Sequence, residues 1–90
     1  MTKEEFRATL VPYTNSTGFY TIDANAILPK GCYGLASFAT YYDGYWAWGL
    51  DAGYHGARWS RESERPLHSF EEAYDDFIDV LSSEGYISID

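Results

Sequence analysis

The clearest pattern of apolar and polar positions lies near the end of the chain, in residues 69–84. Six apolar residues recur there at helical spacing, which predicts an amphipathic helix: Phe70, Ala73, Tyr74, Phe77, Ile78 and Leu81. The opposite half of the same helix carries five acidic residues: Glu71, Glu72, Asp75, Asp76 and Asp79. Ser69 and Glu72 form a capping-box pattern at the start. Gly85 is a residue typical of the position that follows a helix.

Earlier stretches alternate with a period of two and predict strands over residues 19–28, 32–42 and 45–51, with a fourth over 54–59. Residues 29–31 read as a turn. Asp43-Gly44 predicts a two-residue hairpin loop, which would pair Tyr42 with Tyr45 and Ala39 with Trp48. One face of this hairpin would then pack under the helix, and it carries Leu35, Ala39, Tyr41, Trp46, Trp48 and Leu50. The other face would be Tyr-rich and exposed, with Phe38, Thr40, Tyr42, Tyr45, Ala47 and Gly49.

The remaining segments complete a single domain over residues 1–90. Thr2 and Glu5 predict a short helix over residues 3–10, which Pro12 would end. Residues 52–56 read as a turn or bulge, 58–65 as a charged loop that could tie back to the acidic helix, and 86–89 as an edge strand. The fold class is α+β: an antiparallel three- to four-stranded sheet, a short N-terminal helix, and a long C-terminal acidic helix packed on one face.

Charge is unevenly distributed along the chain. The net charge is −8, and all seven charged residues after Arg65 are acidic. This balance argues against direct nucleic-acid binding, which needs cations at phosphates, and favours a basic protein partner. A single cysteine excludes an internal disulfide. With neither a signal peptide nor a long apolar run, we expect a cytoplasmic protein without membrane contact.

No phosphate-binding loop, dinucleotide-binding glycine pattern, zinc spacing or nucleophile elbow is present in the sequence. Cys32, His55 and His68 stand in unrelated contexts, so we expect no catalytic role for them. Carboxylates spaced along one helix supply too few ligands for a cation, so we expect neither metal nor cofactor. Like charges four residues apart on a helix repel each other by a few tenths of a kcal/mol. No lysine on the helix relieves this repulsion, which indicates either that the negative field of the helix has a function or that the acidic residues serve solubility.

Small size, strong acidity, many tyrosines and the absence of catalytic motifs together resemble the phage-encoded anti-CRISPR proteins. The resemblance implies carboxylates presented in place of DNA phosphates, and a CRISPR-Cas effector subunit as partner in a host bacterial cytoplasm. The order of elements is also similar to that of double-stranded RNA-binding domains. Their closing helix is basic, however, so the acidic helix here argues against RNA binding.

The sequence therefore predicts a non-enzymatic inhibitor that blocks a basic nucleic-acid-binding surface of a bacterial defence effector. The predicted contact residues are Glu71, Glu72, Asp75, Asp76, Asp79, Tyr42 and Tyr45. Three alternatives stay open. The first is an antitoxin or immunity protein against a basic nuclease toxin, and the second is a small ligand-binding or enzymatic domain. The third is an oligomerising module, because the sequence is compatible with a homodimer formed through the Tyr-rich face.

Overall fold

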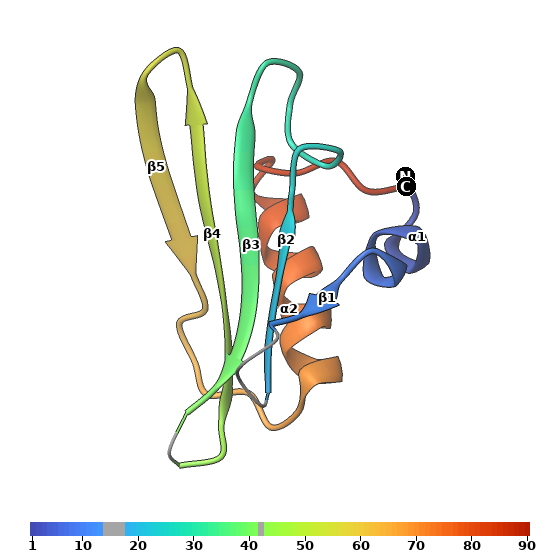
Figure 1. The fold of residues 1–90 in the computed structure, drawn as a ribbon, viewed down its shortest axis with the longest axis vertical. Helices are drawn as coiled ribbons and strands as arrows, with labels where there is room; N and C mark the ends of the chain where they lie inside the picture. The colour runs from blue at the N-terminus through green and yellow to red at the C-terminus, as the bar shows by residue number, and fades with distance from the viewer. Residues whose placement is uncertain (14–17, 42) are drawn as a thin grey trace.

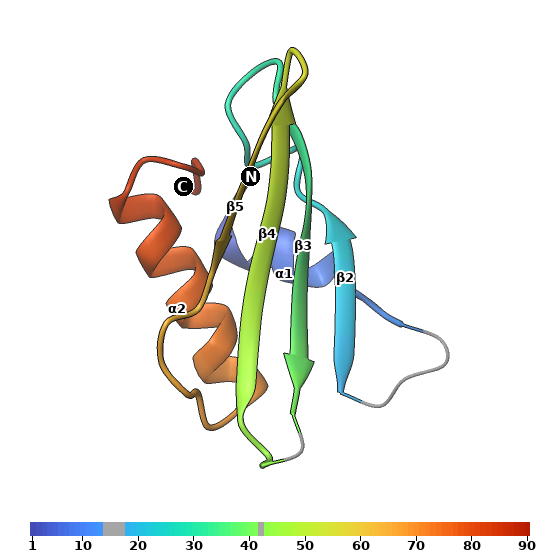
Figure 2. The same ribbon diagram turned by 90° about the vertical axis from the view of Figure 1, so that its left-hand side faces the viewer.

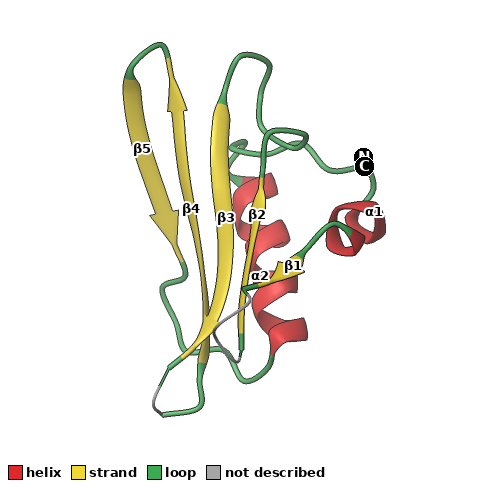
Figure 3. Cartoon of the chain, in the orientation of Figure 1, coloured by secondary structure: helices red, strands yellow, loops and turns green. Residues whose placement is uncertain are grey.

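The computed structural model describes residues 1–13, 18–41 and 43–90. Within them the chain forms one antiparallel sheet and two helices (Figure 1, Figure 3). The elements are α1 (Lys3–Ala8), β1 (Val11–Pro12), β2 (Phe19–Asp23), β3 (Tyr33–Thr40), β4 (Trp46–Tyr54), β5 (Ala57–Glu62) and α2 (Phe70–Ser83). The strand order is β1-β2-β3-β4-β5. The predicted fold class is confirmed in outline, with five strands in the described residues rather than three or four.

The helices and the sheet form two layers. Seen along its edge in Figure 2, the sheet has α2 across one side and no helix across the other. α1 lies beside α2, where the Phe6 ring stacks on Phe77 with 6.2 Å between centroids. The core between the layers is largely aromatic, because Phe38, Phe77 and Tyr74 are all buried there. One face of the sheet is therefore packed and the other faces solvent.

Both helices begin at the predicted caps. At α1 the Thr2 hydroxyl accepts from the Glu5 backbone N–H and the Glu5 carboxylate accepts from the Thr2 backbone N–H, so the capping box is complete. At α2 the Ser69 hydroxyl accepts from the Glu72 N–H at 3.1 Å. The Glu72 carboxylate, however, accepts from the His68 N–H instead of the Ser69 N–H. Only half of the second box is formed.

The helix ends differ in how well the sequence predicted them. α1 ends at Ala8, with Thr9 as C-cap, and does not continue to residue 10. α2 ends as predicted, because Gly85 follows the C-cap with a φ of +81°.

The first predicted long strand, over residues 19–28, is shortened to β2. It ends at Asp23, and residues 24–28 turn inward so that Ala24, Ile27 and Leu28 are buried. The turn at 29–31 is confirmed, because the Cys32 N–H donates to the Pro29 carbonyl at 3.0 Å and Gly31 has a φ of +90°.

The register of the β3–β4 hairpin differs by one residue from the prediction. Phe38 lies opposite Trp48 and Ala39 opposite Ala47. The cause is the loop: Gly44 donates to the Tyr41 carbonyl, Tyr41 donates to the Tyr45 carbonyl, and Gly44 has a φ of +83°. This is the three-residue loop with a left-handed glycine, not a two-residue turn.

A shift of one residue moves a whole strand to the other face of the sheet. Ala36 and Phe38 are accordingly buried beside Trp48 and Leu50, whereas Leu35 is exposed. The predicted core face was thus right for its residues on β4 and wrong for its residues on β3. Ala39 and Tyr41 also belong to the open side, since cross-strand pairing joins Ala39 to Phe19 and Ala47.

The tight two-residue turn occurs at His55-Gly56 instead, between β4 and β5. Tyr54 pairs with Ala57, and both loop residues have positive φ, +47° and +83°, as a type I′ turn requires. The predicted turn at 52–56 is therefore confirmed only at residues 55–56, because residues 52–54 belong to β4. The predicted strand over 54–59 is confirmed in part, and the predicted loop at 58–65 is wrong for residues 58–62, which belong to β5.

The last segment is not the predicted edge strand at 86–89. It lies as an extended tail on the loop after β2, where the Ser88 N–H donates to the Ile27 carbonyl at 2.8 Å and Ile87 is buried. No helix in the described part of the chain is long and apolar enough to cross a membrane.

Candidate interaction surface

The acidic flank of α2 is paired with cations from α1 and from the segment just before α2. Lys3 Nζ lies 2.5 Å from the Asp75 carboxylate, and the Arg7 guanidinium pairs with Glu71. Arg65 bridges Glu72 and Asp76, with both distances at 3.2 Å. Four of the five carboxylates predicted to contact a partner therefore have a cation of their own chain beside them. The flank presents less uncompensated charge than its sequence suggests.

Asp76 is held most tightly of these carboxylates. Its side chain is only 12% exposed. One oxygen accepts from the Trp48 indole N–H at 2.7 Å, and the other accepts from Arg65. A buried indole N–H needs an acceptor, and Asp76 supplies it. The carboxylate therefore has a structural role between α2 and β4.

One carboxylate at each end of α2 has a lowered pKa. The His68 backbone N–H, together with Arg65, lowers the pKa of Glu72. At the other end Arg61 donates from Nε and Nη2 to the two oxygens of Glu84, at 3.0 and 2.6 Å, and lowers the pKa of that carboxyl. The predicted link between the arginine segment and the helix is thus present at Arg61 and Arg65.

The open face of the sheet has a floor of small side chains. Ser37, Ala39, Ala47 and Gly49 lie side by side on β3 and β4. Large exposed side chains stand around this floor: Val11 (60% exposed), Tyr13 (50%), Tyr33 (52%), Leu35 (55%) and Tyr41 (63%). Tyr33 lies directly over Gly53, where a Cβ would come within 2.8 Å of its ring. We call this solvent-facing side of the sheet, which extends from Val11 on β1 to Glu62 on β5, the open face.

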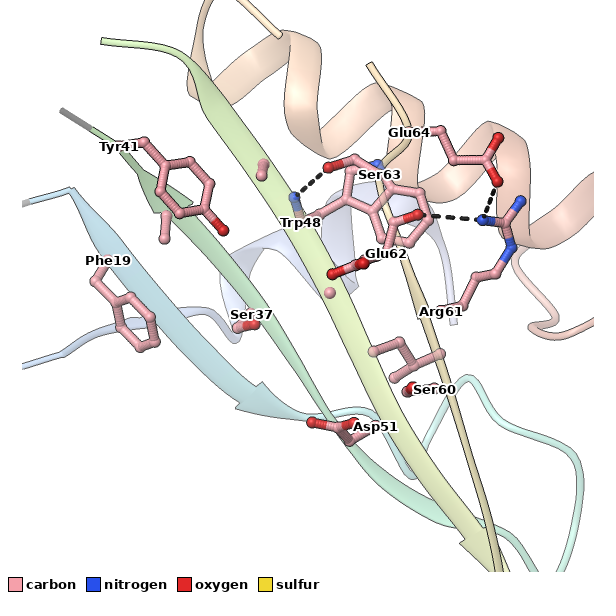
Figure 4. A pocket seen from close by; sticks show the side chains of 14 residues that line it. Phe19, Ser37, Tyr41, Trp48, Asp51, Ser60, Arg61, Glu62, Ser63 and Glu64 are labelled. Carbon is pink, nitrogen blue, oxygen red and sulfur yellow. Dashed lines mark hydrogen bonds and ion pairs between the residues drawn. The ribbon is translucent and has the colours of Figure 1, made fainter. Parts of the chain in front are cut away.

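A groove of about 720 Å³ runs across the open face. Figure 4 shows Phe19 and Tyr41 at one end, with Ser37 on the floor and Asp51 and Ser60 toward the other end. A smaller hollow of about 350 Å³ continues past Asp51 to Asp23, Tyr33 and Arg58. In residues 1–13, 18–41 and 43–90, neither Asp23 nor Asp51 lies within ion-pair distance of a cation. The open face thus combines aromatic side chains with two carboxylates that form no ion pair in the described residues, and Arg58 lines the same hollow.

Of the two tyrosines predicted to contact a partner, Tyr42 lies outside the described residues. Tyr45 lines a hollow together with Tyr41, Ala47 and Glu62, so it borders the open face. Its ring is edge-on to that of His68, with 5.4 Å between the centroids. Sequence reasoning missed Leu35 and Tyr41 because it assigned them to the core face, and it assigned Tyr33 to neither face. The correct hairpin register would have revealed them.

Cys32, His55 and His68 do not meet. His55 follows the last residue of β4, and His68 follows Leu67, which bridges to the first residue of β4. A nine-residue strand separates the two histidines by roughly 25–30 Å. Cys32 precedes β3 at the His55 end. Among the described residues there is also no cluster of His, Cys, Asp and Glu side chains suited to a metal ion.

Fold and surface together define an α+β domain with one packed and one open sheet face. Comparisons with family models, curated proteins and solved structures found no match to this chain.

Proposed function

We propose that this protein is a non-enzymatic binder of a basic protein surface, as an inhibitor of a nucleic-acid-binding defence effector would be. We place its main contact on the open face and not on the acidic flank of α2. The observation that carries the proposal is the combination on one uncovered surface of Tyr33, Leu35 and Tyr41 with the carboxylates Asp23 and Asp51.

A few side chains, among which Tyr, Trp and Arg are enriched, supply most of the binding energy at protein interfaces. The floor of small residues, Ala39, Ala47 and Gly49, leaves room for long side chains to lie flat along the groove. Lysine and arginine have such side chains, and their charged ends would reach Asp23 and Asp51. Charge complementarity therefore favours a basic partner.

The acidic flank has a secondary role in this proposal. Asp79 is exposed and is joined to no cation in the described part of the chain. It would contribute to long-range attraction and hence to the association rate, because screened surface charges act mainly on steering. A basic nuclease toxin would present the same chemistry to the open face. The identity of the captured partner would distinguish an antitoxin from an anti-defence inhibitor.

The experiment is affinity capture from a bacterial lysate at low and high salt with three versions of the protein. The face variant carries Leu35→Ser, Tyr41→Ser and Asp51→Asn, all at exposed positions. The flank variant carries Asp75→Asn and Asp79→Asn. We expect the wild type and the flank variant to retain the same basic nucleic-acid-binding protein at low salt, and the face variant to lose it.

Thermal unfolding of each version checks that the fold is intact. Retention by the face variant together with loss by the flank variant would place the contact on α2 and overturn the proposal. Capture that does not weaken at high salt would contradict the electrostatic part of it.

A further inference from the structure

β5 is the long uncovered edge of the sheet in the described residues. The opposite edge is β1, which has two residues, one of them Pro12, and short proline-containing edges resist further pairing. β5 has six residues, and Ala57, Arg58, Ser60 and Glu62 are exposed. An edge strand of this length presents a row of backbone donors and acceptors to a partner strand.

One hydrogen bond determines which backbone groups of β5 point toward β4 and which point away from the sheet. The Ser63 N–H donates to the Trp48 carbonyl at 3.0 Å, so the backbone groups of Ser63 point toward β4. Backbone N–H and C=O groups of successive residues point alternately to the two sides of an antiparallel strand. Those of Arg61 and Trp59 therefore also point toward β4. Those of Arg58, Ser60 and Glu62 then point away from the sheet. The Glu62 carbonyl accepts from the Arg61 side chain at 3.2 Å, which agrees with this phase.

We propose that β5 pairs antiparallel with β5 of a second copy of this chain, with Ser60 on the two-fold axis. Arg58 then lies opposite Glu62 of the second copy, and Glu62 opposite Arg58, so one surface is complementary to itself. Opposite charges facing each other across strands stabilise the pair. Trp59 lies opposite Arg61 of the second copy on the helix side, a pairing that allows a cation–π contact.

The other registers fit less well. A shift by one residue places residues whose backbone groups point out of the sheet opposite residues whose groups point toward β4. Such a pairing forms no inter-strand hydrogen bonds. An axis at Arg61 places Arg61 opposite itself, which is destabilising. An axis at Trp59 places Arg58 opposite Ser60 and leaves the charges unmatched. The Glu62 carbonyl has two lone pairs, so it can accept from the second copy while it keeps its bond to Arg61.

Pairing through β5 makes one continuous sheet from two copies and joins their open faces on the same side. This inference concerns the β5 edge and does not depend on the proposed function. The face variant described above leaves Arg58, Ser60 and Glu62 unchanged, so the two ideas fail separately.

The first test is the oligomeric state, measured by sedimentation equilibrium from low to high micromolar concentration. We expect a concentration-dependent dimer for the wild type. Arg58→Glu and Glu62→Arg should each raise the dissociation constant about tenfold or more, because two symmetric attractions become repulsions. The double variant Arg58→Glu/Glu62→Arg restores complementarity and should dimerise like the wild type. A monomer at every concentration would overturn the proposal, and so would a dimer that is insensitive to the single charge changes.

The second test is disulfide trapping in a Cys32→Ser background. Ser60→Cys should cross-link two copies under mild oxidation, because Cα atoms in a hydrogen-bonded antiparallel pair are about 5.5 Å apart. Ala57→Cys is the control, since its two copies would stand roughly 20 Å apart in this register. Equal cross-linking at both positions would reject the register. A dimer that is lost in the face variant but kept in Arg58→Glu would move the contact to the open face and reject the β5 pairing.

Discussion

At the scale of single residues, Asp76 shows how a position on the polar side of a helix can belong to the core. The helical wheel groups it with Asp75 and Asp79, yet it accepts from the Trp48 indole N–H and from Arg65. The sequence contains the acceptor and the donor 28 positions apart. Only the sheet register brings them together, so no local pattern could have distinguished Asp76 from Asp79.

Asp76→Ala leaves the Trp48 indole N–H without its acceptor and Arg65 without one partner. We expect a loss of about 1–3 kcal/mol of unfolding free energy, measured by urea denaturation. Asp79→Ala is the matched control, because it makes the same gain in helix propensity at an exposed position, and it should change stability by less than about 0.5 kcal/mol. Equal effects of the two changes would mean that the indole contact contributes nothing to stability.

At the scale of elements, the caps of the two helices could be predicted from sequence and the hairpin register could not. Capping depends on residue types within one turn of the helix end, so Thr2 with Glu5, Ser69 with Glu72, and Gly85 after the end of α2 are readable locally. The β3–β4 register depends on whether the loop holds two residues or three. Asp43-Gly44 suits the first, but the chain uses Gly44 as the left-handed residue of the second. That one residue determined which face of β3 was assigned to the core.

α2 is fastened to the rest of the fold at both ends, through Glu72 and Glu84, and this gives a pH-dependent stability. The His68 N–H and Arg65 lower the pKa of Glu72, and Arg61 lowers that of Glu84. A carboxyl whose folded pKa lies below its unfolded value stabilises the fold above the unfolded pKa, near 4.5, and ceases to do so as the pH falls through the folded pKa.

We therefore expect the double variant Glu72→Gln/Glu84→Gln to unfold at lower urea concentration than the wild type at pH 7. The difference should shrink as the pH falls below about 4.5 and vanish once both carboxyls are protonated in the folded wild type. Urea midpoints measured at several pH values test this. A difference that stays constant down to acid pH would assign the effect to lost packing and not to the charges.

At the scale of the whole molecule, the net charge of −8 does not tell which carboxylates lack a cation beside them, because the fold determines the ion pairs. Lys3 and Arg7 from the first helix, and Arg65 from the segment before the last, gather along α2. The link from the loop that contains Arg65 was predicted, because Arg65 lies 7 and 11 positions from Glu72 and Asp76. The sequence could not show that Lys3 and Arg7 reach the same helix, since Arg7 is 64 positions from Glu71. Asp23 and Asp51, which form no ion pair in the described residues, lie on the open face instead, which is why the proposed contact moves there.

The packing of α1 against α2 makes α1 part of the hydrophobic core. Phe6 is 1% exposed and stacks on both Tyr74 and Phe77 of α2. Phe6→Ala should therefore cost about 3–5 kcal/mol, a large share of the roughly 5–14 kcal/mol expected for a domain of this length. Urea unfolding should show one transition with a lower midpoint and an unchanged slope. Val11→Ala, at a side chain that is 60% exposed, should leave the midpoint almost unchanged. Two separate transitions in Phe6→Ala would mean that α1 unfolds independently, because a helix that contributes to a shared core is lost only when the core is lost.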